Sequence, residues 1–471
     1  MHSALPPAHS RLRVLCERLI LLGIAVLLMR TWYIEGFVVP FQVVGGSMAE
    51  TLLGRHREVT CADCGHVFFC DSEIPKVRRR SVCPLCGHVG DGLDRKPDIA
   101  GDRLLLGKSI FRLRPPRRWE VVAMRHPDRA AKAVVKRVVG LPGEAIQIVE
   151  GDVYVDGQIQ RKSLPTQQAL AVLVHRADRQ PTLTPDAPSA WRPEDAENSS
   201  WGTTNGRFGH PWLTEREPID DWLVYHHLRR RAGKASGFKE TPVTDLCGYN
   251  QTHTRREEDV RPVTDLMLAF RLEEALGDGQ LVLRASDGRD RFEARLTPRS
   301  HRYEVLQNGR PVPAAAGKCP RLQDGATIVF SLFDCQLLLA FDDEVVVQWP
   351  YGPAGDRREP SARPLAIGSQ GGLGAVLSDV RIYRDVYYTH PIGPQGPWAL
   401  AEPCTLGDRE YFVLGDNSPI SDDSRNWATG PGVDADLLLG KPLLVHFPAK
   451  WVEWGDHRFQ VPDPARIRYI R

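Results

Sequence analysis

Residues 133–144 read Ala-Val-Val-Lys-Arg-Val-Val-Gly-Leu-Pro-Gly-Glu. The β-branched residues of this stretch predict a strand that ends in a Pro-Gly turn. Lys136 lies inside the apolar run, so we expect its amine to be forced into a dry environment. Burial without an acidic partner lowers the pKa of a lysine from about 10.4, because desolvation disfavours the charged form. Lys136 is therefore a candidate general base, and the alternative is a surface lysine at a strand end.

A candidate nucleophile precedes this strand. Residues 40–52 read Pro-Phe-Gln-Val-Val-Gly-Gly-Ser-Met-Ala-Glu-Thr-Leu, an apolar extended stretch that leads into Gly-Gly-Ser-Met. Glycines remove side-chain obstruction, so a substrate backbone can approach Ser47 closely. A neutral lysine amine can deprotonate a serine hydroxyl. Taken alone, the motif is also compatible with an ordinary Gly-Ser turn.

A third motif lies far downstream. Residues 411–414 form a short apolar strand, and residues 415–425 then read Gly-Asp-Asn-Ser-Pro-Ile-Ser-Asp-Asp-Ser-Arg. By itself this is a polar turn whose Asx and Ser side chains satisfy the backbone locally. Its carboxylates can also pair with Arg137.

Together with Gly-Asp-Arg-Leu-Leu-Leu at residues 101–106, these ordered motifs resemble the bacterial type I signal peptidase family. The resemblance implies a mainly β catalytic domain that removes signal peptides from exported preproteins with a Ser-Lys dyad and no catalytic cofactor. It implies that Ser47 is the nucleophile, Lys136 the base and Ser421 the residue that orients the lysine amine. The backbone N–H of Ser47 would hold the oxyanion.

Two further groups of residues follow from the same resemblance. A charged network that supports the site would comprise Arg137, Asp416, Asp423 and Arg425. Two shallow apolar pockets for small substrate residues would be formed by Phe41, Val43, Val134 and Val135.

The sequence departs from the family pattern at two positions. Gly45 stands where some relatives have a serine whose hydroxyl is the second oxyanion donor. Glu50 stands where the family usually has proline, which places an unexpected carboxylate three residues past Ser47. Glu50 could reshape the turn or perturb Lys136.

The N-terminal region predicts a membrane anchor. Residues 19–29 are an unbroken apolar run of eleven residues, and apolar character resumes after Arg30 with Trp32 and Tyr33. About twenty such positions cross a bilayer if Arg30 snorkels to the interface. Basic residues before the run place the N-terminus in the cytoplasm and the rest of the chain on the outer face of the plasma membrane. A cleaved signal peptide is the alternative.

Two Cys-x-x-Cys-Gly-His-Val repeats predict a structural metal site. Cys61 and Cys64 form one pair, Cys83 and Cys86 the other, and eighteen residues separate the pairs. This spacing is typical of a four-thiolate zinc ribbon. Two disulfides are the alternative, since an oxidising exterior permits them.

The remaining sequence is an insertion between the second and third motifs. Residues 161–263 are polar and lack periodicity, which indicates an irregular segment. Residues 264–388 contain short alternating strands with Asp-Gly and Asn-Gly turns, which predict an antiparallel β-sandwich. This part resembles laminin-G or concanavalin-like modules, and the resemblance implies a carbohydrate or protein ligand or a spacer role.

The predicted architecture is mainly β. It comprises an anchor at 1–34, a first catalytic part at 35–160 with a zinc ribbon at 57–100, the irregular insertion at 161–263, the sandwich at 264–388 and a second catalytic part at 389–471. The expected partners are signal peptides and membrane lipid. A nucleic-acid partner is not expected, because 61 basic residues nearly balance 59 acidic ones.

Two other functions fit parts of the pattern. One is a membrane-tethered binding protein whose protease site has decayed through Gly45 and Glu50. The other is a self-cleaving repressor-type protease with the same dyad, against which the anchor and the balanced charge argue.

Overall fold

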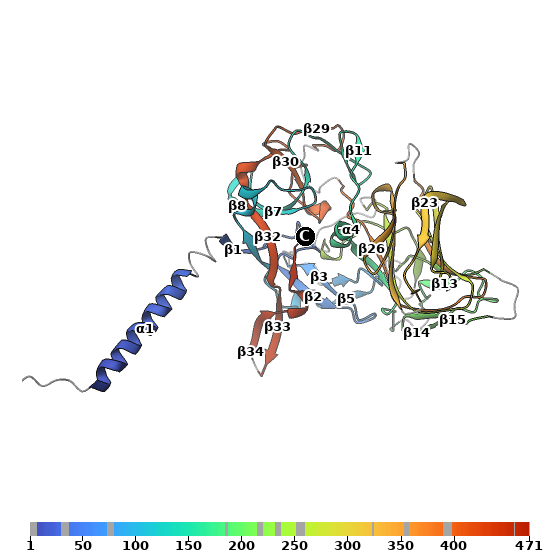
Figure 1. Ribbon diagram of the computed structural model, residues 1–471, viewed down its shortest axis with the longest axis horizontal. Coiled ribbons are helices and arrows are strands. Elements are labelled where there is room, and N and C mark those ends of the chain that lie inside the picture. The colour runs from blue at the N-terminus through green and yellow to red at the C-terminus, as the bar shows by residue number, and fades with distance from the viewer. Residues whose placement is uncertain are drawn as a thin grey trace, which may run out of the picture.

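The protein is represented by a computed structural model. It describes residues 7–29, 37–72, 80–183, 187–213, 220–230, 237–250, 260–322, 325–352, 358–389, 398–455 and 457–470. The described chain is mainly β (Figure 1).

A sheet of eight strands forms the body that carries the candidate site. It runs in the order β1-β6-β32-β7-β8-β30-β31, and β35 also pairs with β32. Its strands are β1 (Val38–Gln42), β6 (Arg103–Gly107), β32 (Leu438–Phe447), β7 (Val121–His126), β8 (Arg129–Gly140), β30 (Glu410–Leu414), β31 (Val433–Asp434) and β35 (Arg468–Tyr469). Strands from both sides of the long insertion therefore pair with one another in one sheet.

A smaller sheet extends this body. Its order is β11-β10-β9-β29, with β9 (Ala145–Val149), β10 (Asp152–Val155), β11 (Gln158–Ile159) and β29 (Cys404–Thr405). The short hairpin β33 (Ala449–Trp454) and β34 (His457–Pro462) projects from the body in Figure 1.

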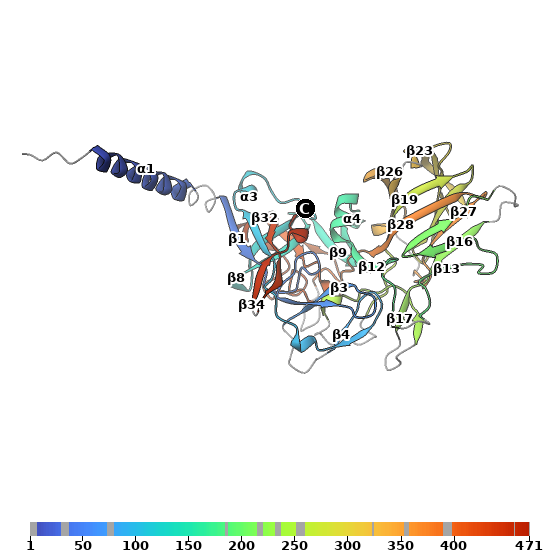
Figure 2. The same cartoon turned by 90° about the horizontal axis from the view of Figure 1, so that it is seen from below.

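The inserted sequence forms a β-sandwich on the side of the body opposite to α1 (Figures 1 and 2). One sheet contains β14 (Gly202–Thr204), β15 (Arg207–His210), β28 (Gly374–Arg384), β19 (Leu266–Leu276), β24 (Ala326–Ser331), β25 (Gln336–Phe341), β26 (Glu344–Pro350) and β12 (Val172–Arg176). The other contains β13 (Trp191–Pro193), β16 (Asp221–Tyr225), β27 (Leu365–Gln370), β20 (Gln280–Ser286), β21 (Arg291–Thr297), β22 (Arg302–Gln307) and β23 (Arg310–Lys318).

The sandwich core explains the alternating pattern of the sequence. Leu268 and Phe270 of β19 face Leu283 of β20 and Ile367 of β27 in one buried cluster. The predicted Asn-Gly turn at 308–309 connects β22 to β23, and both residues have the positive φ that such two-residue hairpin loops require. The predicted antiparallel sandwich is confirmed. The finer resemblance to laminin-G modules stays a prediction.

The stretch 161–263 differs from the expectation of an irregular segment. It contains α4 (Leu164–Leu170), sandwich strands β12 to β16, the hairpin β17 (Leu228–Arg230) and β18 (Phe238–Glu240), and the 3₁₀ turn η3 (Gly248–Asn250). These strands are three to five residues long and lie at the outer ends of the two sheets or pair with β28. Such short peripheral strands need no sustained alternation, so a periodicity argument misses them.

The ribbon region, residues 56–91, consists of two hairpins. The hairpins are β2 (His56–Thr60) with β3 (Val67–Asp71), and β4 (Arg80–Val82) with β5 (Val89–Asp91). The other short helices within the described residues are α3 (Ile110–Leu113), η2 (Leu93–Arg95), η6 (Phe333–Cys335), η7 (Ser418–Ile420), η8 (Ala435–Leu437) and η9 (Pro464–Arg466).

The N-terminal helix α1 (Pro7–Met29) stands apart from the β-rich body in both views (Figures 1 and 2). Judged by length and hydropathy, none of the helices within the described ranges qualifies as a bilayer-crossing segment. The far end of the predicted anchor, residues 30–34, lies outside the described residues. The anchor therefore stays a prediction.

A buried ionic cluster ties the two ends of the insertion together. Lys162 lies just after β11, and its amine donates to Asp334 of the sandwich and, at 2.7 Å, to Asp385 at the end of β28. All three side chains are at least 96% buried. The amine thus links the point where the chain leaves the body that carries the candidate site to the point where it returns.

We predict that Lys162→Met destabilises the protein by about 3–5 kcal/mol, because it leaves two buried carboxylates without their cation. Urea unfolding monitored by circular dichroism measures the change. Lys450→Met is the matched control, since Lys450 pairs with Asp463 at 3.3 Å while 40% exposed and should cost about 1 kcal/mol or less. Equal effects of the two variants would contradict the role given to Lys162.

Candidate active site

Ser47 lies on a loop that leaves β1 and folds back on itself. Val43 N–H donates to the Asp102 carbonyl at 2.9 Å, and Arg55 N–H donates to the Val44 carbonyl at 3.0 Å. The buried Asp102 carboxylate also accepts from Leu53 N–H at 3.1 Å. Residues 43–55, here called the nucleophile loop, are therefore held at both ends against the Gly-Asp motif that precedes β6.

The hydroxyl and the backbone N–H of Ser47 are available for hydrogen bonds to a substrate. Among the described residues, neither its hydroxyl nor its backbone N–H has a hydrogen-bond partner. Its carbonyl, in contrast, accepts from Asn417 N–H at 3.0 Å. The loop is thus anchored through its carbonyl oxygen, which leaves the N–H available to an oxyanion and the hydroxyl available to a substrate carbonyl.

Lys136 is buried, as its place in the apolar run of β8 predicts. Its side chain is 1% exposed, and its amine donates to the Ser421 hydroxyl at 3.0 Å. Burial lowers the pKa of Lys136 to about 8, although Asp423 and then Asp422 oppose part of that shift. A substantial fraction of the amine is therefore neutral near physiological pH.

The third motif meets Lys136 because of strand pairing. β30 pairs with β8 so that Leu414 lies opposite Arg137, and the chain then turns at Gly415. A Cβ on Gly415 would lie 2.2 Å from the Ser421 hydroxyl oxygen and 2.4 Å from the Ser47 carbonyl oxygen. Only glycine fits there, and its absent side chain lets the nucleophile loop approach the serine that holds Lys136.

Ser47 and Lys136, the two members of the predicted dyad, lie near common neighbours but do not contact each other. Ser421 contacts Lys136, and Gly415 contacts both Ser421 and Ser47. Within the described residues, no hydrogen bond joins the Ser47 hydroxyl to the Lys136 amine. Their catalytic partnership therefore stays a prediction.

The predicted charged network is present as two separate buried pairs. Arg137 donates to both carboxylate oxygens of Asp416 at 2.8 and 2.7 Å, and both side chains are 1% exposed. Arg425 donates to Asp423 at 2.9 and 2.7 Å, and both side chains are fully buried. Such bidentate geometry fixes orientation, so the pairs brace the loop 415–425 around Ser421.

The predicted substrate pockets are only partly assembled. Phe41, Val43 and Val135 belong to one apolar cluster with Met48 of the nucleophile loop. Val134 packs instead in a different cluster around Trp427. Successive residues of a strand point to opposite faces, so Val134 and Val135 cannot line the same surface. Val134 therefore packs apart from the other three residues, and the assignment of the substrate pockets stays a prediction.

Glu50 does not point at the base. The charges that act most strongly on Lys136 are those of Asp423 and Asp422, whereas Glu50 interacts with Arg384 and accepts from Cys247 at 3.8 Å. Glu50 lines a cavity of about 500 Å³ whose wall also includes Arg137 and Asp416. Desolvation by the surrounding protein atoms raises the pKa of the Glu50 carboxyl, although the residue remains exposed to water.

Two residues of the site were missed by the sequence analysis. Tyr249 and Asn250, from η3, pack against Gly46 and Asn417. They lie in the stretch that lacks periodicity, some 200 residues from the nucleophile loop. No local signal marked them, because their role depends on where the insertion returns to the body.

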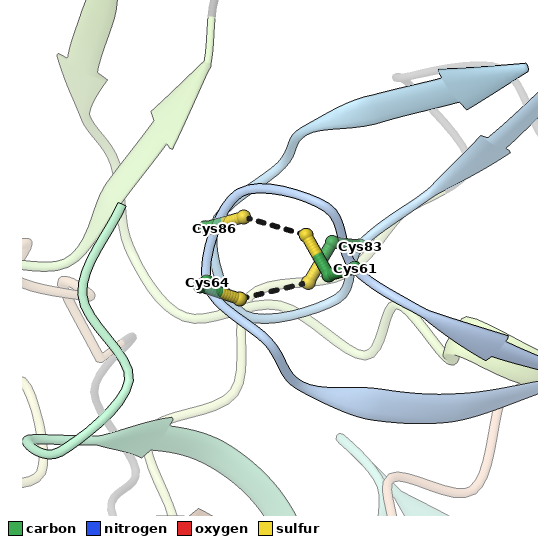
Figure 3. Close-up of side chains that lie close together, drawn as sticks. All are labelled: Cys61, Cys64, Cys83 and Cys86. Carbon is green, nitrogen blue, oxygen red and sulfur yellow. Dashed lines mark hydrogen bonds between the residues drawn. The ribbon is translucent and has the colours of Figure 1, made fainter. Parts of the chain in front are cut away.

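The four predicted metal ligands converge. The Sγ atoms of Cys61, Cys64, Cys83 and Cys86 all lie within 4.8 Å of one another (Figure 3). The separations between Cys61 and Cys86 and between Cys64 and Cys83 are 3.6 and 3.7 Å. A disulfide needs about 2.05 Å. Zinc–sulfur bonds of about 2.3 Å in a tetrahedron place sulfurs about 3.8 Å apart, so the set fits a tetrahedral metal.

The backbone of the two turns supports the same conclusion. In each repeat, the first cysteine accepts from the N–H of the glycine and donates to the carbonyl of the histidine. Gly65 and Gly87 have φ values of 67° and 69°. The two turns are equivalent in structure, as the sequence repeat predicts.

We predict that Lys136→Met stabilises the folded protein at pH 7. A folded pKa of about 8, against 10.5 when unfolded, means that the unfolded state binds more protons between these values. The free energy of unfolding of the wild-type chain therefore rises by about 3 kcal/mol as pH increases through this window. Below pH 8 the full cost of burying the charged Lys136 amine is present. Urea unfolding of both proteins at pH 7 and pH 10 measures this. The prediction is contradicted if Lys136→Met exceeds wild type in unfolding free energy by as much at pH 10 as at pH 7.

Comparisons with known proteins agree with the site. The family described as "Signal peptidase, peptidase S26" matches residues 89–191, which include Lys136 and Arg137. Ser47 and the loop 415–425 lie outside the matched region.

Similar proteins include a probable signal peptidase I-2 of Synechocystis sp., 41% identical over 64 residues, which are 12% of this chain and 29% of the relative. Signal peptidase I of Leptolyngbya laminosa is 40% identical over 65 residues, which are 12% of this chain and 32% of the relative. The chain thus spans about three tenths of the length of these relatives.

Among solved structures, a carbohydrate-binding module of Bacillus subtilis covers 41% of this chain and 95% of its own, at 11% identity and a TM-score of 0.25. A TM-score of this size supports no functional argument. The matched region contains Lys136 and Arg137, and the flanking motifs fold onto them. By these features, residues 89–191 of the chain are similar to signal peptidases of the S26 peptidase family.

Proposed function

We propose that the protein is a membrane-bound serine endopeptidase that removes signal peptides from exported preproteins. The observation that carries this proposal is the buried amine of Lys136, with its lowered pKa, hydrogen-bonded to Ser421 beside the nucleophile loop. A neutral lysine in a dry pocket next to a serine with a free hydroxyl is the arrangement that nucleophilic catalysis requires.

In the proposed mechanism, the Ser47 hydroxyl attacks the scissile carbonyl and Lys136 accepts its proton. Ser421 orients the lysine amine through its hydroxyl. The Ser47 N–H stabilises the oxyanion that forms. The apolar surface of Phe41, Val43 and Val135 receives the small residues before the cleavage point. No cofactor takes part in these steps.

The proposed location is the plasma membrane, with the N-terminus in the cytoplasm and the catalytic body on the outer face. α1 supports this proposal, because Leu19 to Leu22 have exposed fractions of 58–64% along one continuous run. An exposed apolar surface of this kind needs an apolar environment, and lipid provides one.

A second candidate function is a catalytically decayed binding protein that uses the sandwich to hold a carbohydrate or protein ligand. The observation that favours it is the missing hydrogen bond between Ser47 and Lys136 within the described structure. The assay below separates the two candidates.

We predict that membranes containing the protein process a secretory precursor, and that Ser47→Ala and Lys136→Ala each abolish processing. The value of kcat/KM should rise with pH through about 8, as the Lys136 amine loses its proton. Gel analysis of a labelled precursor across pH 6–10 measures both. Lys318→Ala, which removes an exposed lysine at the end of β23 in the sandwich, is the control and should retain activity and the same pH profile. Unchanged processing by the Ser47 variant would favour the binding protein.

We also propose that the four-cysteine cluster holds a structural zinc ion. Cys61, Cys64, Cys83 and Cys86 would supply four thiolates and leave no open position, so the metal would stabilise the fold and take no part in the reaction. The separations between their sulfur atoms support this proposal.

We predict one zinc ion per chain in the purified protein, and its loss in Cys61→Ser. Removing one of four thiolates from a closed site weakens binding and lowers the melting temperature, because metal binding contributes to folding. Elemental analysis and thermal unfolding measure the two effects. Cys404→Ser, outside the cluster, should change neither. Absence of metal together with four oxidised thiols at these positions would contradict the assignment.

A further inference from the structure

The turn η3 lies between the metal ribbon and the nucleophile loop. Tyr249 is fully buried and packs with Ala49 and Leu53 of that loop and with Phe69 of β3. The inserted sequence therefore contributes a wall to the catalytic body, at the place where the loop would otherwise face solvent.

The ring of Tyr249 spans the nucleophile loop. A Cβ on Gly46 would lie 2.2 Å from the ring carbon Cε1, so the ring sits directly on the Gly46 backbone. The hydroxyl of Tyr249 donates to the Arg55 carbonyl at 2.9 Å. One side chain thus contacts the loop immediately before Ser47 and again near its far end.

Asn250 contacts the loop through a second residue. Its amide nitrogen donates to the side-chain oxygen of Asn417 at 2.6 Å, and the amide nitrogen of Asn417 donates back at 2.6 Å. The same nitrogen of Asn417 donates to the Gly46 carbonyl at 2.9 Å, while Asn417 N–H donates to the Ser47 carbonyl. The Gly46 carbonyl, an acceptor, requires the nitrogen end of the Asn417 amide, and the reciprocal pair with Asn250 holds the amide in that place.

Rotation of that amide would place two oxygens against each other. Without a partner at position 250, Asn417 could turn its oxygen towards the Gly46 carbonyl, which offers no proton. Both asparagines are buried, at 6% and 2% exposure, so water cannot readily replace the lost bonds.

We propose that Asn250 and Tyr249 are positioning residues for Ser47, and that the insertion thereby sets the geometry of the nucleophile. This inference rests on the proposed peptidase function. Asn250 orients Asn417, which donates hydrogen bonds to the carbonyls of Gly46 and Ser47. Tyr249 packs against the same backbone. The insertion is then part of the catalytic apparatus as well as an accessory module.

Two substitutions of Asn250 with similar volume test this proposal. Asn250→Leu fills the space but cannot hydrogen-bond, so kcat should fall roughly 10- to 100-fold while KM stays within about threefold. Asn250→Asp can still accept from Asn417, and when protonated it can also donate, so kcat should stay within about fivefold of wild type. Asn198→Ala removes an exposed asparagine of the same insertion and should have no effect.

A purely structural role predicts the opposite order. If Asn250 only fills space, leucine is the milder substitution and the buried carboxyl of aspartate the more harmful one. An Asn250→Leu variant with normal kcat, or an aspartate variant that is equally or more impaired, would overturn the proposal.

A second measurement separates this inference from the peptidase assignment. Amide hydrogen exchange of residues 44–50 should be faster in Asn250→Leu than in wild type and unchanged in Asn198→Ala, whether or not a precursor is cleaved. If wild type cleaves no precursor but the exchange follows this pattern, the enzyme assignment fails and the positioning role stands. Unchanged exchange in Asn250→Leu overturns the positioning role.

Discussion

The burial of the Lys136 amine is the constraint on which the site depends. A lysine amine in water is almost wholly protonated at neutral pH, and desolvation on β8 brings its pKa to about 8. The carboxylates of Asp422 and Asp423 raise this pKa. Their effect is limited because each carboxylate also pairs with other residues. Asp423 is held by Arg425, and Asp422 pairs with His126 and Arg129. The site therefore tolerates carboxylates near its base because other cations hold them.

The residues around the site have to bring together three segments that are far apart in the sequence: the nucleophile loop, β8 and the loop 415–425. They have to do so without filling the space between these segments. Two buried arginine–aspartate pairs fix the loop 415–425, and they are separate, so each braces one end of it. The glycine at position 415 then permits backbone contact with the nucleophile loop. Isolated buried ion pairs add little net stability, so their value here is orientation.

The insertion is joined to the body by polar contacts at several points. Lys162 and Asp385 meet where the chain leaves and returns. Asp63, inside the first cysteine turn, accepts from the backbone of Thr182 and Leu183 and from Arg230. The four-cysteine region thus contacts the inserted sequence through Asp63, and η3 packs against both β3 and the nucleophile loop.

By itself, the sequence determined the features that depend on local chemistry. The apolar context of Lys136, the cysteine repeats and the long alternating strands of the sandwich each carry their physical reason within a short window, and the structure agrees with these three expectations. The role of the Gly-Gly-Ser motif stays a prediction. Only the tertiary structure decided the rest. It placed Val134 and Val135 on opposite faces, recruited short strands of 161–263 into the sandwich and set Tyr249 and Asn250 against the nucleophile loop. These outcomes depend on which surfaces meet after the chain has folded, and contacts between residues 194 and 167 positions apart leave no periodic trace along the sequence.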